Sequence, residues 1–231
     1  DRRSTSAVLD DGRVEELTSG RDRGAGIRVV VGETTGFAHT ADLTSAGLRS
    51  AAEAAGAAAR SGSGGVREVV LSPSRTLPPA IVEVFPADVS KQRKVALLER
   101  ADAVARAEGD AITQVMVRYG DSQRRIQIAN SDGLLAGDRQ VRTMFSVSAV
   151  ATGDTGMQTG RESVGNTVGF ELFDHVDVGD LAQRASRRAI VKLDAVPAPS
   201  GEMAVVVGPG GGGVLFHEAC GHGLEADLVA K

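Results

Sequence analysis

Apolar and polar residues alternate along several stretches of the chain, and this period of two predicts β-strands. The clearest case is 140–152, where apolar residues recur at the odd-numbered positions and share one face. Turn-forming residues at 10–12, 119–122 and 130–133 divide neighbouring strands into antiparallel hairpins. The predicted strands are 4–9, 14–19, 25–31, 37–40, 66–71, 111–119, 122–130, 133–137, 140–152 and 203–207.

Apolar residues spaced by three and four positions predict three helices, at 44–60, 89–108 and 179–194. Thr44 is the expected N-cap of the first helix, and Gly109 closes the second. The prolines of 72–79 predict an irregular connection, because proline lacks a backbone donor. The Gly-rich stretch 153–169 has no clear pattern and receives no assignment.

These elements predict an α+β fold with antiparallel or mixed sheets and packed helices, followed by the beginning of a third segment. Residues 1–85 form an expected N-terminal domain of strand hairpins and a helix. Residues 86–198 form an expected middle domain, in which helices flank antiparallel strands. The third segment, 199–231, contains a strand, a glycine loop at 208–213 and a helix, and we expect it to be truncated.

Composition narrows the possible functions. The chain has 231 residues, of which 42% are hydrophobic and 24% charged, and its net charge is −4. These values suit a globular protein and give no basic surface for nucleic acid. Aromatic residues make up only 3% of the chain and Trp is absent, so a base-stacking surface is not expected either.

The sequence also bears on cellular location. No apolar run approaches the length of a membrane span, and the first residues, DRRSTSAVLDDG, lack the apolar core of a signal peptide. A single cysteine, Cys220, fits a reducing compartment. We therefore expect a cytoplasmic protein without a membrane partner. The preference for Arg over Lys resembles the coding bias of a GC-rich bacterial genome.

The hexapeptide His217-Glu218-Ala219-Cys220-Gly221-His222 contains half of the four histidines in the chain. A hydrolytic zinc site needs neutral imidazole ligands, an open coordination position for water and a nearby base. His217 and His222 can supply two ligands, and Glu218 can act as the base. The alternative is that two histidines lie beside a glutamate by chance.

The spacing of the two histidines is unusual, because they are five residues apart. In an ideal α-helix, residues at i and i+5 point about 140° apart and cannot face one ion. We therefore predict a distorted helix that bulges or unwinds between His217 and His222, and a π-type bulge is one known form of such a distortion. Gly221 is expected to lower the cost of that distortion.

The stretch GPGGGGVLFHEACGHGLEAD (208–227) resembles the signature of the catalytic subunit of the TldD/PmbA family. GRVEELTSGRDRGAGIRV (12–29) and NSDGLLAGD (130–138) resemble the amino-terminal and middle hairpins of the same family. PAPSGEMAVVVGPG (197–210) resembles the entry to its catalytic domain, so the resemblance implies that the α+β fold is followed by the start of a catalytic domain. The resemblance covers essentially the whole chain, which corresponds to about half of a full family member.

The resemblance implies a cytoplasmic zinc peptidase that cleaves flexible or unfolded polypeptide and pairs with a non-catalytic paralogue of the TldE/PmbA type. By the match, His217 and His222 bind zinc and Glu218 is the general base. The resemblance also implies a third ligand, a cysteine far downstream of Lys231. A non-catalytic scaffold or partner subunit with the same fold remains the alternative, because two histidines alone do not complete a zinc site.

Other residues near the motif have weaker claims. Cys220 is expected to be a packed core residue and not the third ligand. Glu225 and Asp227 are expected to support the ligands or face solvent. The glycine run 208–213 matches GxGxxG, but a flexible loop that substrate approaches is favoured over a nucleotide site.

Further polar residues are expected to be structural. His39 and His175 lack metal-ligand spacing to other residues, and Arg124 and Arg125 are expected on the solvated side of a strand. The arginines near the end of the third helix are expected to form its polar face; they are Arg184, Arg187 and Arg188.

Overall fold

The computed structural model describes residues 1–59, 70–74 and 81–229. It divides into two compact units, Asp1–Ala195 and Val196–Lys231, which we call unit 1 and unit 2. Helices and antiparallel sheets occur together, which confirms the α+β class. The division into three domains at residues 85 and 198 stays a prediction.

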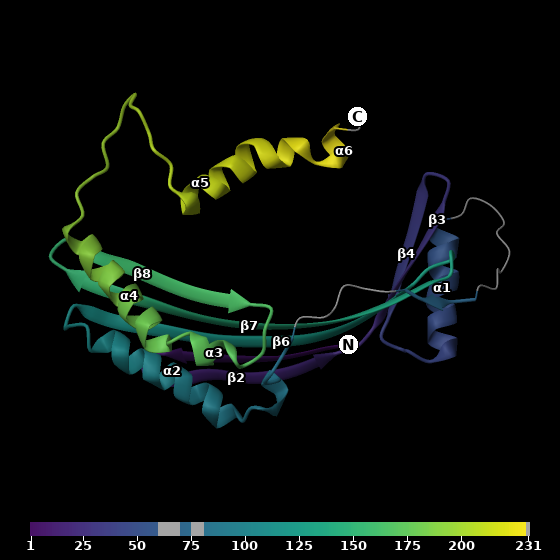
Figure 1. Ribbon diagram of the computed structural model, residues 1–231, viewed down its shortest axis with the longest axis horizontal. Helices are drawn as coiled ribbons and strands as arrows, with labels where there is room; N and C mark the ends of the chain where they lie inside the picture. The colour runs from purple at the N-terminus through teal and green to yellow at the C-terminus, as the bar shows by residue number, and fades with distance from the viewer. Residues whose placement is uncertain (60–69, 75–80, 230–231) are drawn as a thin grey trace. The chain divides into compact units, whose positions relative to one another are not determined.

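A six-stranded sheet forms the body of unit 1 (Figure 1). Its strand order is β2-β1-β6-β7-β5, and β8 also pairs with β7. The first hairpin of the chain therefore belongs to the same sheet as the strands of the predicted middle domain. The strands are β1 (Arg2–Asp10), β2 (Arg13–Asp22), β5 (Ser72–Pro73), β6 (Ile112–Ala129), β7 (Leu134–Gly153) and β8 (Gly156–Asn166).

The hairpin predicted at 119–122 is wrong, because β6 runs through it without interruption. Gly120 lies between Ser6 of β1 and Met144 of β7 in the registers of the sheet. Hydrogen bonding on both sides keeps this segment extended despite its turn-forming residues. In the same way, the strands predicted at 133–137 and 140–152 are the single strand β7.

The hairpin at 130–133 is confirmed, and it joins β6 to β7. Gly133 has a φ of 89°, a conformation that glycine adopts at little cost. The Asn130 side-chain oxygen accepts hydrogen bonds from the backbone N–H groups of Asp132 and Leu134, both at 3.0 Å. The side chain of Asn130 therefore stabilises the turn.

Two strands were not predicted. The Gly-rich stretch 153–169 contains β8, and 72–79, expected to be irregular, begins with β5. In β5 the N–H groups of Ser72 and Ser74 donate to Gly133 and Leu135, so the missing donor of Pro73 is not needed. The strand predicted at 66–71 lies mostly outside the described residues, and its last two residues are irregular.

Two long helices cover one face of the sheet, α2 (Lys91–Arg106) and α4 (Val178–Val191) (Figure 1). The first lies within the helix predicted at 89–108, and α4 begins one residue before the helix predicted at 179–194; their N-caps are Ser90 and Asp177. The odd-numbered residues of β7 from Val141 to Ala151 face these helices and are buried, as predicted. Residues with at most 1% exposure in this core include Leu9, Leu98, Val115, Val117, Tyr119, Phe145, Val147 and Val178.

Short helical turns complete this part of unit 1. They are η1 (Pro86–Asp88), α3 (Leu172–His175) and η2 (Lys192–Asp194). His175 ends α3 and is exposed. Arg184, Arg187 and Arg188 form the polar face of α4, as predicted, and pair with Glu162 or Glu108.

Unit 1 buries a charged cluster beneath α2. The ammonium group of Lys94 lies 2.7 Å from the Asp121 carboxylate, and both side chains are at most 6% exposed. The Tyr119 hydroxyl donates a hydrogen bond to the same carboxylate at 2.8 Å. Burial, together with the Asp121 charge, raises the pKa of Tyr119, so the hydroxyl stays protonated and keeps donating.

A second, two-stranded sheet packs against a helix of its own. It contains β3 (Ala25–Val31) and β4 (Thr34–Thr40), and α1 (Ser45–Ala59) covers one face. Thr44 caps α1, as predicted, because its hydroxyl accepts from the Gly47 N–H at 3.2 Å.

Unit 2 is an irregular segment followed by a helical rod. The strand predicted at 203–207 is wrong, because these residues are irregular and exposed, with no partner strand among the described residues. The predicted glycine loop is also wrong, because Gly210–Gly213 are helical. The helical elements are α5 (Pro209–Phe216), a π-helical turn η3 (His217–Gly221), a 3₁₀ turn η4 (His222–Leu224) and α6 (Ala226–Val229).

Pro209 explains why a glycine run can be helical. Proline suits the first position of a helix, since its φ is already helical and its missing N–H is not required there. The first turn closes when Gly212 N–H donates to the Gly208 carbonyl at 3.0 Å.

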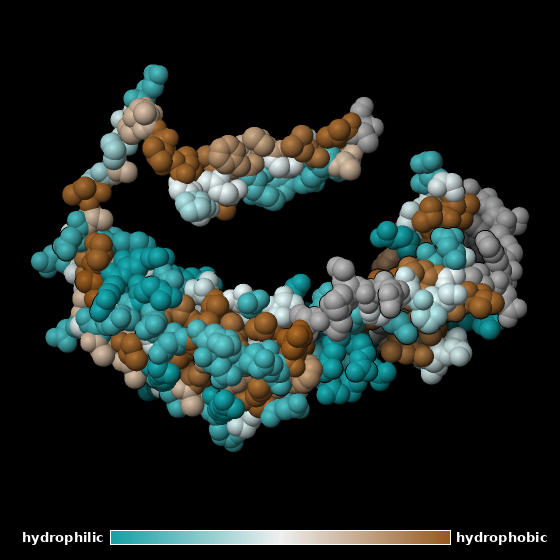
Figure 2. Space-filling view, viewed as in Figure 1, coloured by the Kyte–Doolittle hydropathy of each residue, from teal (hydrophilic) through white to brown (hydrophobic). Residues whose placement is uncertain are grey.

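Unit 2 exposes many apolar side chains. Figure 2 shows hydrophobic residues along one edge of this segment. They include Val205, Val206, Val207, Val214, Leu215, Phe216, Leu224 and Leu228. In the described part of the chain, no helix combines the length and apolarity that crossing a membrane requires.

Candidate metal centre

The motif histidines flank a π-helical turn. Residues His217–Gly221 form η3, in which the backbone N–H of His222 donates to the carbonyl of His217, five residues earlier. This i→i+5 bond confirms the predicted distortion. The bond closes a wider turn than an α-helix has, and it brings residues five apart onto the same side of the rod.

Gly221 does not have the expected role in this turn. Its φ of −61° and ψ of −50° are ordinary right-handed helical values, which any residue adopts. The π turn therefore does not depend on the conformational freedom of glycine. The predicted distortion is confirmed, while the contribution expected of Gly221 finds no support in these backbone angles.

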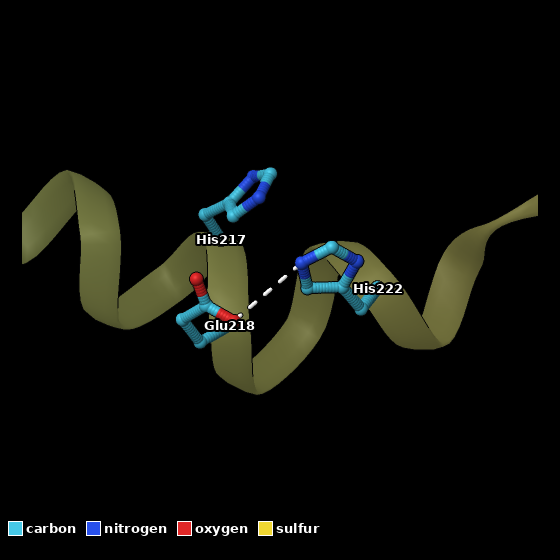
Figure 3. A group of neighbouring side chains, drawn as sticks. All are labelled: His217, Glu218 and His222. Atoms are coloured by element: carbon cyan, nitrogen blue, oxygen red, sulfur yellow. Dashed lines mark ion pairs between the residues drawn. The ribbon is translucent and has the colours of Figure 1, made fainter.

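The π turn brings the three predicted site residues together (Figure 3). The ring centroids of His217 and His222 are 4.5 Å apart, with the ring planes at 71°. Potential ligand atoms of His217, Glu218 and His222 all lie within 4.8 Å of one another. Zinc binds imidazole nitrogen at about 2.0–2.1 Å, so small rotations of these side chains would let both rings contact one ion.

Glu218 lies beside one ring nitrogen of His222. Its carboxylate oxygen Oε2 is 3.5 Å from Nε2 (Figure 3). The carboxylate is therefore next to the position that an ion bound by Nε2 would take. A carboxylate in that position can accept a proton from water at the ion.

Glu225 contacts the other nitrogen of the same ring, His222 Nδ1. Sequence reasoning had given Glu225 only a general supporting role. A carboxylate that accepts a hydrogen bond from Nδ1–H leaves Nε2 as the free nitrogen of a neutral imidazole. Glu225 and Glu218 thus flank His222, each at a different nitrogen.

The site is open to solvent. The side chains of His222, Glu225 and Glu218 are 50%, 52% and 63% exposed. Zinc hydrolases commonly use three protein ligands, and the described residues bring only two histidines and one glutamate together. The exposed side of the cluster leaves space for a further ligand and for substrate.

The remaining candidates lie apart from the cluster. Cys220 is exposed, so the expectation of a packed core residue is wrong for this structure. Asp227 lies on α6 and is exposed. His39 lies on β4, where its ring faces that of Phe37 at 6.4 Å, and neither His39 nor His175 joins a metal-binding group among the described residues.

The nucleotide alternative loses its structural basis. A dinucleotide fingerprint requires a strand, a glycine turn and then a helix. In residues 203–213 as described, the strand is absent and the glycines are part of α5.

Comparisons with known proteins identify related chains. Residues 1–59 match the family model described as PmbA/TldA metallopeptidase domain 1, and residues 85–193 match that of the PmbA/TldA metallopeptidase central domain. A Metalloprotease TldD homolog from Haemophilus influenzae is 36% identical over 98% of this chain and 48% of its own length. A Metalloprotease from Methanothermobacter thermautotrophicus is 32% identical over 99% of this chain and 50% of its own length.

A solved structure supports the fold. TldE from Thermococcus kodakarensis superposes with a TM-score of 0.66 at 16% identity, over 85% of this chain and 44% of that one. At this identity the similarity establishes the fold alone. The chain spans about half the length of the curated relatives it matches.

Proposed function

The chain belongs to the TldD/PmbA family of metallopeptidases, and on that premise we propose that it carries the metal-binding and general-base residues of a zinc-dependent peptidase. The observation that carries the proposal is the π turn, which gathers His217, Glu218 and His222 on one side of the rod. Without that turn, the spacing of the two histidines would separate the rings.

In this proposal His217 and His222 hold the zinc ion. Zinc, when bound, polarises the scissile carbonyl and lowers the pKa of water to about 7. Glu218 accepts the proton of the attacking water and later delivers it to the leaving amine. Its position 3.5 Å from His222 Nε2 supports this role, because the carboxylate lies next to a ligand atom without having to be a ligand itself.

Glu225 acts on His222. By accepting a hydrogen bond from Nδ1–H, it keeps the ring in the tautomer and orientation that direct Nε2 away from Glu225 and toward the ion. Glu225 is therefore a positioning residue in this proposal and has no direct part in proton transfer.

The substrate and the partner follow from family membership. We propose that the protein cleaves flexible or unfolded polypeptide in the cytoplasm. A non-catalytic subunit of the TldE/PmbA type is the proposed partner, and the shared fold with a solved TldE is compatible with such a pair. The exposure of the motif supports an extended substrate, because an extended chain can reach side chains on an open rod.

One observation favours the alternative of a non-catalytic scaffold. Only two imidazoles meet in the described cluster, and a hydrolytic zinc site commonly has three protein ligands. The third ligand implied by the family resemblance, a cysteine downstream of Lys231, would remove this objection for the full-length protein.

Metal analysis and cleavage assays on the full-length protein, together with its paralogous partner, separate the two possibilities. We expect His217→Ala to abolish zinc binding. Glu218→Gln should retain zinc and reduce cleavage of an unstructured peptide by about 10²–10⁴-fold, the usual contribution of a general base.

Glu202→Gln is the matched control, because Glu202 is an exposed glutamate of the same unit outside the metal-binding group. It should leave both zinc content and cleavage unchanged. Undiminished cleavage by the Glu218→Gln protein would overturn the mechanism. Unchanged zinc content in the His217→Ala protein would overturn the assignment of the ligands.

A further inference from the structure

Three arginines surround a hollow on the main sheet of unit 1. The hollow has a volume of about 480 Å³. We call it the arginine hollow and define it by its lining residues, Arg2, Asp22, Ser122, Arg124, Gln140 and Arg142. All of its lining residues belong to unit 1, and none is a residue of the motif.

Strand register explains how these residues meet. Arg2 of β1 lies opposite Arg124 of β6, and Arg124 lies opposite Gln140 of β7. Arg142 is the next residue of β7 on the same face, because side chains alternate between the two faces of a sheet. All three arginines alternate with residues that face α2 and α4, so the hollow is on the side of the sheet away from these helices.

The charges in the hollow are unbalanced. Three guanidinium groups and one carboxylate, Asp22, leave a surplus of two positive charges in a chain whose net charge is −4. Within the described residues, no ion pair or side-chain hydrogen bond involves Arg2, Arg124 or Arg142. Like charges directly opposite each other in a sheet are destabilising, so the pair Arg2 and Arg124 costs stability unless an anion offsets it.

The opposite face of the same strands shows a different arrangement. A second hollow there, of about 290 Å³, contains two carboxylates, Asp1 and Asp88. Arg21 pairs with Asp1 at 2.6 Å, and Arg139 lies over the ring of Phe85 at 4.0 Å. Two of the four arginines that line that second hollow, Arg21 and Arg139, therefore have protein partners. Among the described residues, none of the three arginines of the arginine hollow has an ion pair or a side-chain hydrogen bond, which leaves their guanidinium groups available to a ligand.

We propose that the arginine hollow binds an oxyanion, a carboxylate or a phosphate group of a small molecule or of a peptide. Guanidinium groups match the geometry of such anions, because their N–H donors form a fixed fork that can hold two oxygens. The Ser122 hydroxyl and the Gln140 amide add neutral donors at the same place. The volume is within the usual range for small-ligand sites.

The test is calorimetric titration of the full-length protein at low ionic strength, with sodium phosphate in one series and sodium glutarate in another. We expect saturable binding of at least one anion. Arg124→Gln should weaken that binding about tenfold or more, a change of about 1.4 kcal/mol or more. Since Arg124 is exposed and the substitution removes the like-charge pair with Arg2, the variant should fold and should be no less stable than the unchanged protein.

Arg118→Gln is the matched control. Arg118 is exposed on the same strand and the same face, but it lies outside the hollow and donates to the Met116 sulfur at 3.1 Å. This change should alter binding less than about twofold, because it removes a similar charge from the surface without touching the hollow.

The relative affinities of the two anions identify the class of ligand. Tighter binding of phosphate would identify a phosphate-bearing ligand, and tighter binding of glutarate would identify a carboxylate. No saturable binding of either anion at millimolar concentrations would overturn the proposal. Equal weakening by Arg124→Gln and Arg118→Gln would also overturn it, because binding would then follow overall charge alone.

Discussion

The buried charged pair of unit 1 differs in environment from the charged groups of the motif in unit 2. In unit 1 the charged pair Lys94 and Asp121 is buried beneath a helix, where each group needs its partner. In unit 2 the charged and imidazole groups of the motif are half exposed and contact one another along an open rod. The comparison indicates that the stability of the fold and the proposed chemistry depend on different residues.

Glycine residues also have different roles in the two units. A methyl group added at Gly160 of β8 would lie 2.0 Å from the Ala185 carbonyl oxygen of α4, so glycine is needed for the helix to approach the sheet. Gly36 of β4 has the same relation to Ala55 of α1, also at 2.0 Å. In unit 2, a methyl group at Gly213 would meet nothing within 4 Å. Glycine in unit 1 is required by packing, whereas this glycine of α5 is not.

We expect the largest loss of folding stability from Lys94→Met, because this change leaves the Asp121 carboxylate buried without its cation. Removing one partner of a buried ion pair typically destabilises a protein by about 3–5 kcal/mol. Urea unfolding of the full-length protein should show this loss, while zinc affinity of the folded protein stays unchanged. The double variant Lys94→Met, Asp121→Asn should recover part of the stability, since no buried charge remains. A stability equal to that of the unchanged protein would show that the pair is not buried in solution.

Gly160→Ala tests the close approach of α4 to β8. We expect a loss of about 3 kcal/mol, at the upper end for overpacking, because the added methyl group meets backbone atoms that cannot rotate away. Gly120→Ala is the control, since a methyl group on that glycine of β6 would meet nothing within 4 Å. Chemical unfolding of both variants gives the comparison. Equal stabilities would mean that α4 does not lie against Gly160.

Glu225→Ala tests whether Glu225 of unit 2 orients the ring of His222. We expect zinc affinity to fall by about 10–100-fold, the usual effect of removing a group that orients a ligand histidine. Competition with a chelator measures this affinity independently of peptide cleavage. Glu225→Gln should recover part of it, because the amide oxygen still accepts a hydrogen bond from Nδ1–H. Unfolding in urea should be unaffected, and a large loss of stability would contradict the separation of the two units' roles.

The smallest effect at neutral pH concerns Glu171 of unit 1. Burial raises the pKa of this carboxyl, but hydrogen bonds from the backbone amides of Gly169 and Val84 outweigh burial, so its pKa is below the ordinary value. A lowered pKa in the folded state contributes stability above the unfolded-state pKa, and this stability is lost as pH falls through the folded-state pKa.

Unfolding experiments between neutral pH and pH values below about 4.5 should therefore show a loss of stability on acidification. In Glu171→Gln, which cannot titrate, this loss should be smaller. Glu202→Gln, which changes an exposed glutamate of unit 2, should retain the full pH dependence. Identical pH dependence in the two variants would exclude Glu171 as a source of acid sensitivity.

Much of the candidate site could be predicted from the sequence. The residue types in the hexapeptide indicated ligands and a base, and the five-residue spacing required a bulge, which the π turn supplies. The contact between Glu225 and His222 could not be predicted in the same way. It depends on how the chain turns after the motif, through the 3₁₀ turn that brings Glu225 back to the ring.

The sequence by itself determined the local elements: the alternation in β7, the caps of α1 and α2, and the turn at 130–133. These features depend on residues near one another in the chain, whose conformational preferences act locally.

Only the tertiary structure decided which extended segments pair with neighbouring strands. Residues 119–122 stay extended because strands lie on both sides of them. The apolar stretch 203–207 is not a strand, since no strand of the described residues pairs with it. The three arginines of the arginine hollow come from three different strands, and the register of the sheet brings them together. Backbone hydrogen bonds between distant segments decide these outcomes, because every buried N–H and carbonyl group needs a partner that the local sequence does not contain.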